Sequence, residues 1–147
     1  MQTQLAIFKL NNDTLYGIDV NSVIAFIVKE EANINFTPST TPIIEGIATI
    51  RGEPSPIVNL DKWINEENID RKDLIHKLII QSRIKNRIVS LFVQDVVGIY
   101  DIEESKISTL ESNEKVDFIC YTTIEGKEEL CVVLHYENML RELNLLS

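Results

Sequence analysis

Four side chains in this sequence are of the kinds that most often act as nucleophiles, general bases or ligands of transition metals. They are two histidines, His76 and His135, and two cysteines, Cys120 and Cys131. A cysteine nucleophile needs a histidine within hydrogen-bond reach, and a zinc site needs a recognisable ligand spacing. Ten residues separate the cysteines, and neither histidine follows a glycine-rich turn or a metal motif. The pattern favours buried, reduced thiols and predicts no catalytic residue, metal or cofactor.

The composition indicates one globular domain, covering residues 1–147. The net charge is −9 at pH 7, hydrophobic residues make up 44% of the chain, and charged residues make up 25%. Such an acidic chain lacks the lysine and arginine surface that binds phosphate backbones, so nucleic acid is not an expected partner. The longest apolar runs are about five residues, against roughly 20 needed to span a bilayer, and no signal peptide is recognisable. We therefore expect a cytoplasmic protein without direct membrane insertion.

Residues 46–60, GIATIRGEPSPIVNL, predict a β-hairpin with an arginine at its turn. Two β-compatible apolar runs flank a segment of glycine and proline, in which Gly52 can adopt a positive φ without steric cost. Arg51 should then lie at a strand end beside the turn. An exposed arginine in that place is suited to anchor a protein interface, and the alternative is a surface ion pair with Glu45 or Glu53. The residue types leave both roles open.

The rest of the chain predicts a mainly β fold with little helix. Turn residues separate about ten short apolar runs of strand character. Thr41 and Pro42 have the residue types of a helix start. Near the end of the chain, Met139, Leu140, Leu143 and Leu146 share one helical face, which predicts an amphipathic helix that caps an open edge of the sheets. The clearest strands are expected at residues 5–10, 15–20, 47–50, 57–60, 78–80, 87–93, 118–124 and 130–134.

The apolar pattern repeats once along the chain. Three segments in the first half have counterparts 73 to 75 residues further on, in the same order, as in Phe26 and Ile99. A repeat of this length is typical of two similar structural units. It predicts two small β-barrels with a common core, made by intertwined halves of about 15–75 and 76–135, with the N-terminal strand and the C-terminal helix packing across them.

Four short motifs also follow one another along the chain. They are LYGIDV at 15–20 with Val23 behind it, GIATIRG at 46–52, PIVNL at 56–60 and VQDVVGI at 93–99. In the same order and at similar spacing, they resemble the FGIDI…V, GVINLRG, PVVDL and VDxVxxV stretches of the CheW-like coupling domains of bacterial chemotaxis. The resemblance extends from about Leu5 to Leu140.

The resemblance implies two SH3-like five-stranded β-barrels and a non-catalytic adaptor that couples chemoreceptors to a CheA-type histidine kinase. The implied partners are the cytoplasmic tip of methyl-accepting chemoreceptors and the regulatory domain of the kinase, so that receptor arrays would hold the protein at the inner face of the membrane. The implied receptor-binding residues are Val23, Gly46, Arg51 and Gly52, and the kinase-binding residues stay unassigned. From the residues alone, Val23 can also be a core residue and Gly46 a turn or close-packing glycine.

Four positions depart from the family pattern, namely Ala25, Thr49, Asn59 and Asp61. The family commonly has an acidic residue, an asparagine, an aspartate and a basic residue in these places. We place each lost polar or charged group near the binding surface. The fold expectation is unaffected, but the departures favour, as a second function, a scaffold for a divergent, non-flagellar chemosensory pathway. A small hydrolase is the least favoured alternative.

Overall fold

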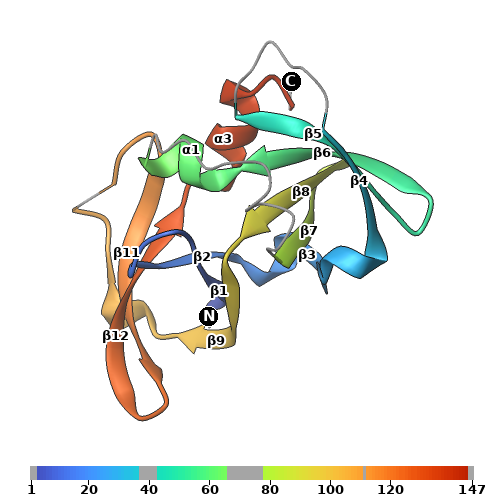
Figure 1. Cartoon of the computed structure of the whole chain (residues 1–147). Coiled ribbons are helices and arrows are strands. Elements are labelled where there is room, and N and C mark those ends of the chain that lie inside the picture. The colour runs from blue at the N-terminus through green and yellow to red at the C-terminus, as the bar shows by residue number, and fades with distance from the viewer. Residues whose placement is uncertain (1–2, 37–42, 66–77, 111, 146–147) are drawn as a thin grey trace.

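Two six-stranded β-sheets form most of the structure (Figure 1). The structure is a computed structural model, and it describes residues 3–36, 43–65, 78–110 and 112–145. The helices are α1 (Leu60–Asn65) and α3 (Tyr136–Glu142), with short 3-10 turns η1 (Val20–Ser22), η2 (Lys29–Glu31) and η3 (Glu104–Lys106). The strands are β1 (Thr3–Lys9), β2 (Leu15–Asp19), β3 (Val23–Ile27), β4 (Ala32–Phe36), β5 (Ile44–Ile50), β6 (Glu53–Asn59), β7 (Leu78–Ile84), β8 (Arg87–Val93), β9 (Asp95–Ile102), β10 (Ile107–Ser108), β11 (Val116–Ile124) and β12 (Lys127–Leu134).

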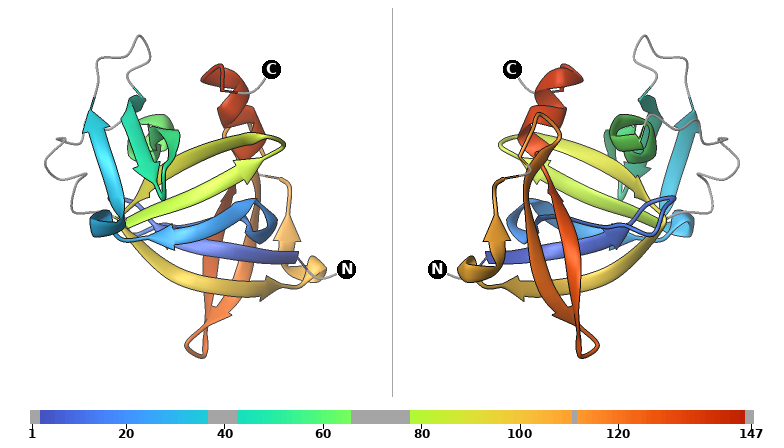
Figure 2. Two further views of the ribbon diagram at one scale, coloured as in Figure 1. Left: turned by 90° about the vertical axis from the view of Figure 1, so that its right-hand side faces the viewer. Right: turned by 90° about the vertical axis from the view of Figure 1, so that its left-hand side faces the viewer.

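The two sheets have the same strand plan and exchange a hairpin. Sheet A has the order β9-β1-β2-β12-β11-β10, and sheet B has the order β3-β7-β8-β6-β5-β4. The β1–β2 hairpin from the start of the chain therefore completes the sheet of the later strands, and β7–β8 completes the sheet of the earlier ones. Figure 2 shows β1, in blue, beside its partner β9, in gold. Each of the predicted halves, 15–75 and 76–135, thus contributes strands to both sheets.

Short parallel ladders attach the exchanged hairpins. In sheet B, residues 57–59 of β6 pair with residues 90–92 of β8. In sheet A, residues 131–133 of β12 pair in the same way with residues 15–17 of β2. All other strand pairs are antiparallel. The predicted mainly β fold class, with two barrel-like subdomains and short helices, is confirmed, although each sheet has six strands where five per barrel were expected.

Three buried clusters fill the fold. The largest joins one face of each sheet to α1 and α3, and it includes Phe8, Leu91 and Trp63. The second lies within sheet A and contains both cysteines, and the third lies within sheet B around Phe92. An apolar sheet face must be shielded from water to be stable. In the shared cluster, each sheet shields the apolar face of the other.

The C-terminal helix packs against the core that the two sheets share. Instead of capping a sheet edge, α3 buries its apolar side chains in the shared cluster, and Leu146 lies outside the described residues. The hydroxyl of Tyr136 forms a buried hydrogen bond with that of Ser82 on β7. Burial raises the pKa of Tyr136 to about 12, although the bond with Ser82 acts in the opposite direction. The helix therefore stabilises the junction of the sheets.

Some observed strands differ from the predicted ones by a few residues or were not predicted. Residues 32–36, which are not among the predicted strands, form the edge strand β4. Gly46 lies inside β5, because that strand begins three residues earlier than the predicted one, at Ile44. The predicted helix start at Thr41 and Pro42 lies outside the described residues.

Tyr136→Phe should reduce the loss of stability at alkaline pH. The raised pKa means that the folded state keeps the phenol neutral while the unfolded chain ionises it near pH 10, so stability falls as the pH rises above 10. This single group should cost about 1 kcal/mol by pH 11. Urea denaturation between pH 8 and 11 measures the slope. Tyr121→Phe, which removes the hydroxyl of an exposed tyrosine, is the control and should keep the wild-type slope.

Candidate functional site

The β5–β6 hairpin ends in a two-residue turn formed by Arg51 and Gly52. Ile50 pairs with Glu53, and the turn residues have φ angles of 52° and 81°. Positive φ at both central positions is typical of the type I′ turn, whose twist matches that of the flanking strands. Arg51 is thus the first turn residue itself and not a neighbour of the turn. The structure places its side chain in solvent at the tip of the hairpin.

Arg51 is not used by the fold. Among the described residues it has no salt bridge and no side-chain hydrogen bond. Of its two expected ion-pair partners, Glu45 is buried and bonded to Lys62 at 2.7 Å, and Glu53 forms no such pair. The guanidinium is therefore available to a carboxylate of another molecule.

The equivalent turn of sheet A has the opposite charge. Glu125 and Gly126 join β11 to β12 with φ angles of 52° and 80°, so the two turns have nearly the same backbone conformation. A cation therefore marks one barrel tip and an anion the other. This difference gives partners a means to distinguish two otherwise similar barrels.

Gly46 has a structural reason to be glycine. It is buried in β5 at a β-bulge, with a φ of 156°. A Cβ atom there would lie 2.0 Å from the carbonyl oxygen of Asn35 and 2.8 Å from the Cα atom of Phe36, both in β4. The close approach of β4 accounts for the glycine without any partner.

Val23 lies at the edge of the shared core. It is half-buried, begins β3, pairs with Ser82 and packs against the shared cluster. Along sheet B, strands β7, β8 and β6 separate β3 from β5. The four predicted site residues therefore lie on two parts of sheet B: Gly46, Arg51 and Gly52 lie within about 20 Å on one hairpin, and Val23 lies on the edge strand β3.

Apolar residues around these groups are exposed. Ile47, on the outward face of β5 that leads to Arg51, is 44% exposed, and Ile24, Phe26 and Val28 beside Val23 are 45%, 40% and 44% exposed. The sequence did carry a signal for the second set, because VIAFIV is apolar at every position. A strand with two apolar faces is either buried on both or covered by a partner on one. We name Ile24, Phe26 and Val28 the β3 strip.

Two of the departures from the family pattern are internal. Asn59 is completely buried: its side-chain oxygen accepts a hydrogen bond from the backbone N–H of Lys62, and its amide nitrogen lies 3.3 Å from a Glu45 oxygen. Asp61 is also buried and accepts a 2.7 Å hydrogen bond from the backbone N–H of Asn11. Their expected place near the binding surface is therefore wrong.

The other two departures differ from each other. Ala25 packs against the cluster inside sheet B, so no acidic group could lie there without being partly buried. Thr49 is half-buried on the outward face of β5, beyond Ile47 and before Arg51. Of the four departures from the family pattern, only Thr49 therefore alters the outward surface of the hairpin next to Arg51.

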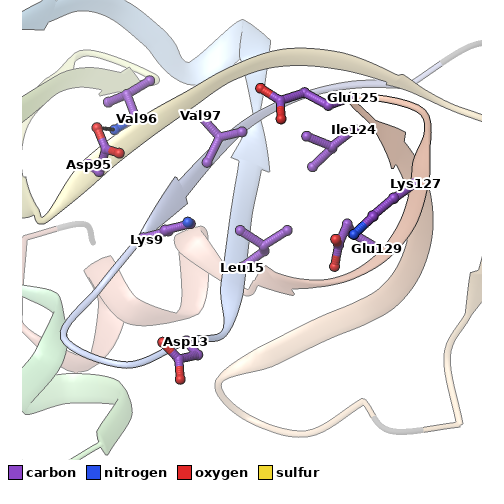
Figure 3. Close-up of a pocket in the computed structure, with 10 residues that line it drawn as sticks. All are labelled: Lys9, Asp13, Leu15, Asp95, Val96, Val97, Ile124, Glu125, Lys127 and Glu129. Atoms are coloured by element: carbon purple, nitrogen blue, oxygen red, sulfur yellow. Dashed lines mark hydrogen bonds between the residues drawn. The ribbon is translucent and has the colours of Figure 1, made fainter.

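A charged pocket opens at the end of sheet A (Figure 3). It has a volume of about 540 Å³ and is lined by two lysines, four carboxylates and four aliphatic residues. No histidine, cysteine or serine lines it, so it holds no nucleophile paired with a histidine base. Its residues are Lys9, Asp13, Leu15, Asp95, Val96, Val97, Ile124, Glu125, Lys127 and Glu129.

The two cysteines and His135 do not form a nucleophile and base pair in the pocket, because none of them lines it. Cys120 and Cys131 are buried within sheet A, His135 is half-buried before α3, and His76 lies outside the described residues. Within the described ranges, no cluster of three or more histidine, cysteine, aspartate or glutamate side chains could hold a metal ion. The helices in the same ranges are too short or too polar to cross a membrane.

Comparison with known proteins identifies the family. Residues 4–144 match the family model described as the CheW-like domain. The chain belongs to the CheW-like domain family. A chemotaxis protein CheW from Thermotoga maritima is 24% identical to this CheW-like domain over 138 residues, which cover 94% of this chain and 87% of the relative. The crystal structure of the scaffolding protein TtCheW from Thermoanaerobacter tengcongensis has the same fold, with a TM-score of 0.72 and 24% identity over 91% of this chain and 89% of that one.

Gly46→Ala should destabilise the fold by at least about 2 kcal/mol, because the new methyl group would collide with the β4 backbone and not with a movable side chain. Gly126→Ala is a matched control: its Cβ would meet no atom within 4 Å, so only the left-handed backbone penalty of about 1 kcal/mol applies. Urea denaturation followed by Trp63 fluorescence measures both. Equal losses for the two variants would contradict the close-packing role.

Asn59→Asp, which restores the common family residue, should cost about 1–3 kcal/mol, because it replaces the amide donor facing Glu45 with a second carboxylate. The cost should shrink when Glu45→Gln is present, since the repulsion then disappears. A double-mutant cycle of unfolding free energies measures this coupling. Additive effects of the two substitutions would show that the two side chains do not interact.

Proposed function

We propose that this CheW-like domain is a non-catalytic chemotaxis adaptor that couples chemoreceptors to a CheA-type histidine kinase. The observation that carries the proposal is the family match over residues 4–144, which spans both sheets and both described α-helices. A relative named as a chemotaxis protein and a structural neighbour named as a scaffolding protein support the same role. The charged pocket has no histidine, cysteine or serine in its lining, so it gives no support to a hydrolase with a cysteine and histidine pair.

The β5–β6 hairpin and the β3 strip are the surfaces we assign to the receptor. Arg51 is free to pair with a carboxylate, Gly52 shapes the turn that presents it, and Ile47 offers an apolar contact on the same hairpin. Gly46 contributes by letting β4 pack against β5. A helical receptor tip needs such a combination, since helices dock through spaced apolar anchors with charged contacts at the rim.

Val23 and the β3 strip extend this surface. Val23 is half-buried, so it supports the strip from the core side more than it contacts a partner directly. Ile24, Phe26 and Val28 supply the exposed apolar area that a partner helix would cover.

Sheet A offers a separate apolar surface for the regulatory domain of the kinase. Tyr121 and Leu130 pair across β11 and β12, and both are exposed, at 47% and 43%. Ile99 on β9, the counterpart of Phe26 in the repeat, is 50% exposed. Two surfaces on two different sheets would allow both partners to bind at once, as coupling requires.

Coupling also needs differential binding. An adaptor changes kinase activity only if its affinity differs between the active and inactive kinase states, since equal affinity shifts no equilibrium. We expect residues 1–147 to act as one domain in the cytoplasm, held at the inner face of the membrane through receptor arrays. Thr49, the departure that lies on the β5 face, favours the second possibility of a divergent, non-flagellar chemosensory pathway.

Arg51→Glu should weaken binding to a chemoreceptor tip fragment of the same organism by about 1–3 kcal/mol, roughly 5- to 150-fold in Kd, because it replaces a cation with an anion at the interface. Binding to the kinase regulatory domain should not change, and the thermal midpoint should stay within about 2 °C, since the fold does not use the guanidinium. Isothermal titration calorimetry with each partner measures the two affinities.

Glu125→Lys is the matched control, because it changes a charge at the equivalent turn of the other sheet. It should leave receptor affinity at the wild-type value. Unchanged receptor binding by Arg51→Glu would remove the hairpin from the receptor site, and failure of the wild-type protein to bind either partner would refute the adaptor function.

A further inference from the structure

The two cysteines of the chain are opposed across one β-ladder. Cys120 on β11 pairs directly with Cys131 on β12, and both belong to the buried cluster within sheet A. Directly opposed residues of an antiparallel pair point to the same face of the sheet, with Cα atoms about 4.5–5.5 Å apart. A disulfide accepts Cα separations of about 4.4–6.8 Å. The two sulfur atoms can therefore be joined without separating or shifting the strands.

The strand register that places the two cysteines opposite each other is fixed by the β11–β12 hairpin and by the pairing of β12 with β2. The two-residue turn at Glu125 and Gly126 sets the pairing of Ile124 with Lys127, and six further pairs continue the ladder to Phe118 and Val133. On the other side of β12, Cys131 pairs with Leu15 of β2. A one-residue slip would turn each cysteine to the opposite face, so the ladder holds the thiols together in every folded molecule.

We propose that Cys120 and Cys131 are an oxidative modification site, which forms a reversible intramolecular disulfide when the protein meets a peroxide. The site is independent of the adaptor function, because it follows from the ladder and the buried cluster alone.

The reaction is balanced by one peroxide molecule. The Cys120 thiolate attacks one peroxide oxygen, breaks the O–O bond and becomes a sulfenic acid, while the leaving hydroxide takes up the proton that the thiol lost. The sulfur of Cys131 then attacks the Cys120 sulfur, the S–O bond breaks, and the departing hydroxide leaves as water with the proton of the Cys131 thiol. In sum, two thiols and one hydrogen peroxide give one disulfide and two water molecules, and the sulfurs are oxidised as the peroxide is reduced.

The local electrostatics assign the first step to Cys120. A hydrogen bond between the two thiols lowers the pKa of Cys120, although burial opposes this, and the same bond together with burial raises the pKa of Cys131. Because the thiolate is the nucleophile, Cys120 reacts with peroxide and Cys131 resolves the product.

Access to Cys120 is controlled by the shortest strand of the sheet. Cys120 lies on β11 beside β10, a two-residue edge strand, and it pairs there with Ile107. The side chain of Ile107 is half-buried and packs against the cysteine cluster. A two-residue edge strand has few hydrogen bonds to break, so local opening there exposes Cys120 at much lower cost than unfolding.

The test treats the reduced, folded full-length protein with hydrogen peroxide and follows its intact mass. Since the chain has no other cysteine, a loss of two hydrogen atoms from the monomer can only be this disulfide. Non-reducing trypsin digestion should then give one linked pair of peptides, residues 116–127 and 128–141, which separates on treatment with dithiothreitol. Oxygen addition without hydrogen loss, or a disulfide-linked dimer as the main product, would overturn the proposal.

Two kinds of variant test the roles of the residues. Cys131→Ser, which keeps a hydroxyl donor beside Cys120, should keep the reactivity of Cys120, seen as trapping of its sulfenic acid by dimedone, whereas Cys120→Ala should give little dimedone adduct. Ile107→Ala should raise the rate of disulfide formation at least about fivefold, because it loosens the cover of Cys120. Ser108→Ala in the same short strand is the control and should keep the wild-type rate. An unchanged rate in Ile107→Ala would refute the access route, and dimedone labelling at Cys131 would refute the assignment of the first step.

Discussion

Two parallel ladders of three residue pairs each hold this fold together. Without the ladder between β6 and β8, the β7–β8 hairpin would have no strand pairing with the β4–β6 part of sheet B, and the ladder between β12 and β2 has the same role in sheet A. Because each hairpin comes from the other half of the chain, neither sheet can be completed until both halves have been made. The exchange places one face of each sheet against the other, and α1 and α3 cover the same junction from one side of the molecule (Figure 1).

This arrangement explains where polar groups lie. At the junction, Glu45, Asn59 and Lys62 satisfy one another beneath α1, and Trp63 donates a 2.6 Å hydrogen bond to Glu142 of α3. Buried polar groups are costly unless they are bonded, so a change at one of these positions is expected to need a matching change at its partner. The departures of Asn59 and Asp61 from the family pattern are therefore adjustments of the interior, which leave the outer surfaces free to respond to partners.

The same architecture leaves apolar area exposed in matching places on both sheets. Phe26 lies on β3 and Ile99 on β9, which are corresponding edge strands of the two sheets. Ile47 lies on β5 and Tyr121 on β11, which are the strands next to the opposite edges. An internal repeat therefore gives two similar exposed apolar faces, and the turn charges of Arg51 and Glu125 make them different. Under the adaptor proposal, the similar barrels would supply the contact area and the turn charges would select which partner binds which barrel.

The sequence by itself determined the features that depend on neighbours along the chain. The hairpin of residues 46–60 with Gly52 in its turn, the repeat, the mainly β class and the family motifs were all readable, because strand period and turn chemistry are local. Only the tertiary structure decided how the halves exchange their hairpins, why Gly46 must lack a side chain, that Asn59 and Asp61 lie inside, and that Cys120 opposes Cys131. Each of these depends on a strand or helix distant in sequence, such as β4 against Gly46 or Glu45 against Asn59, and residue type at one position does not specify which distant segment will pack there.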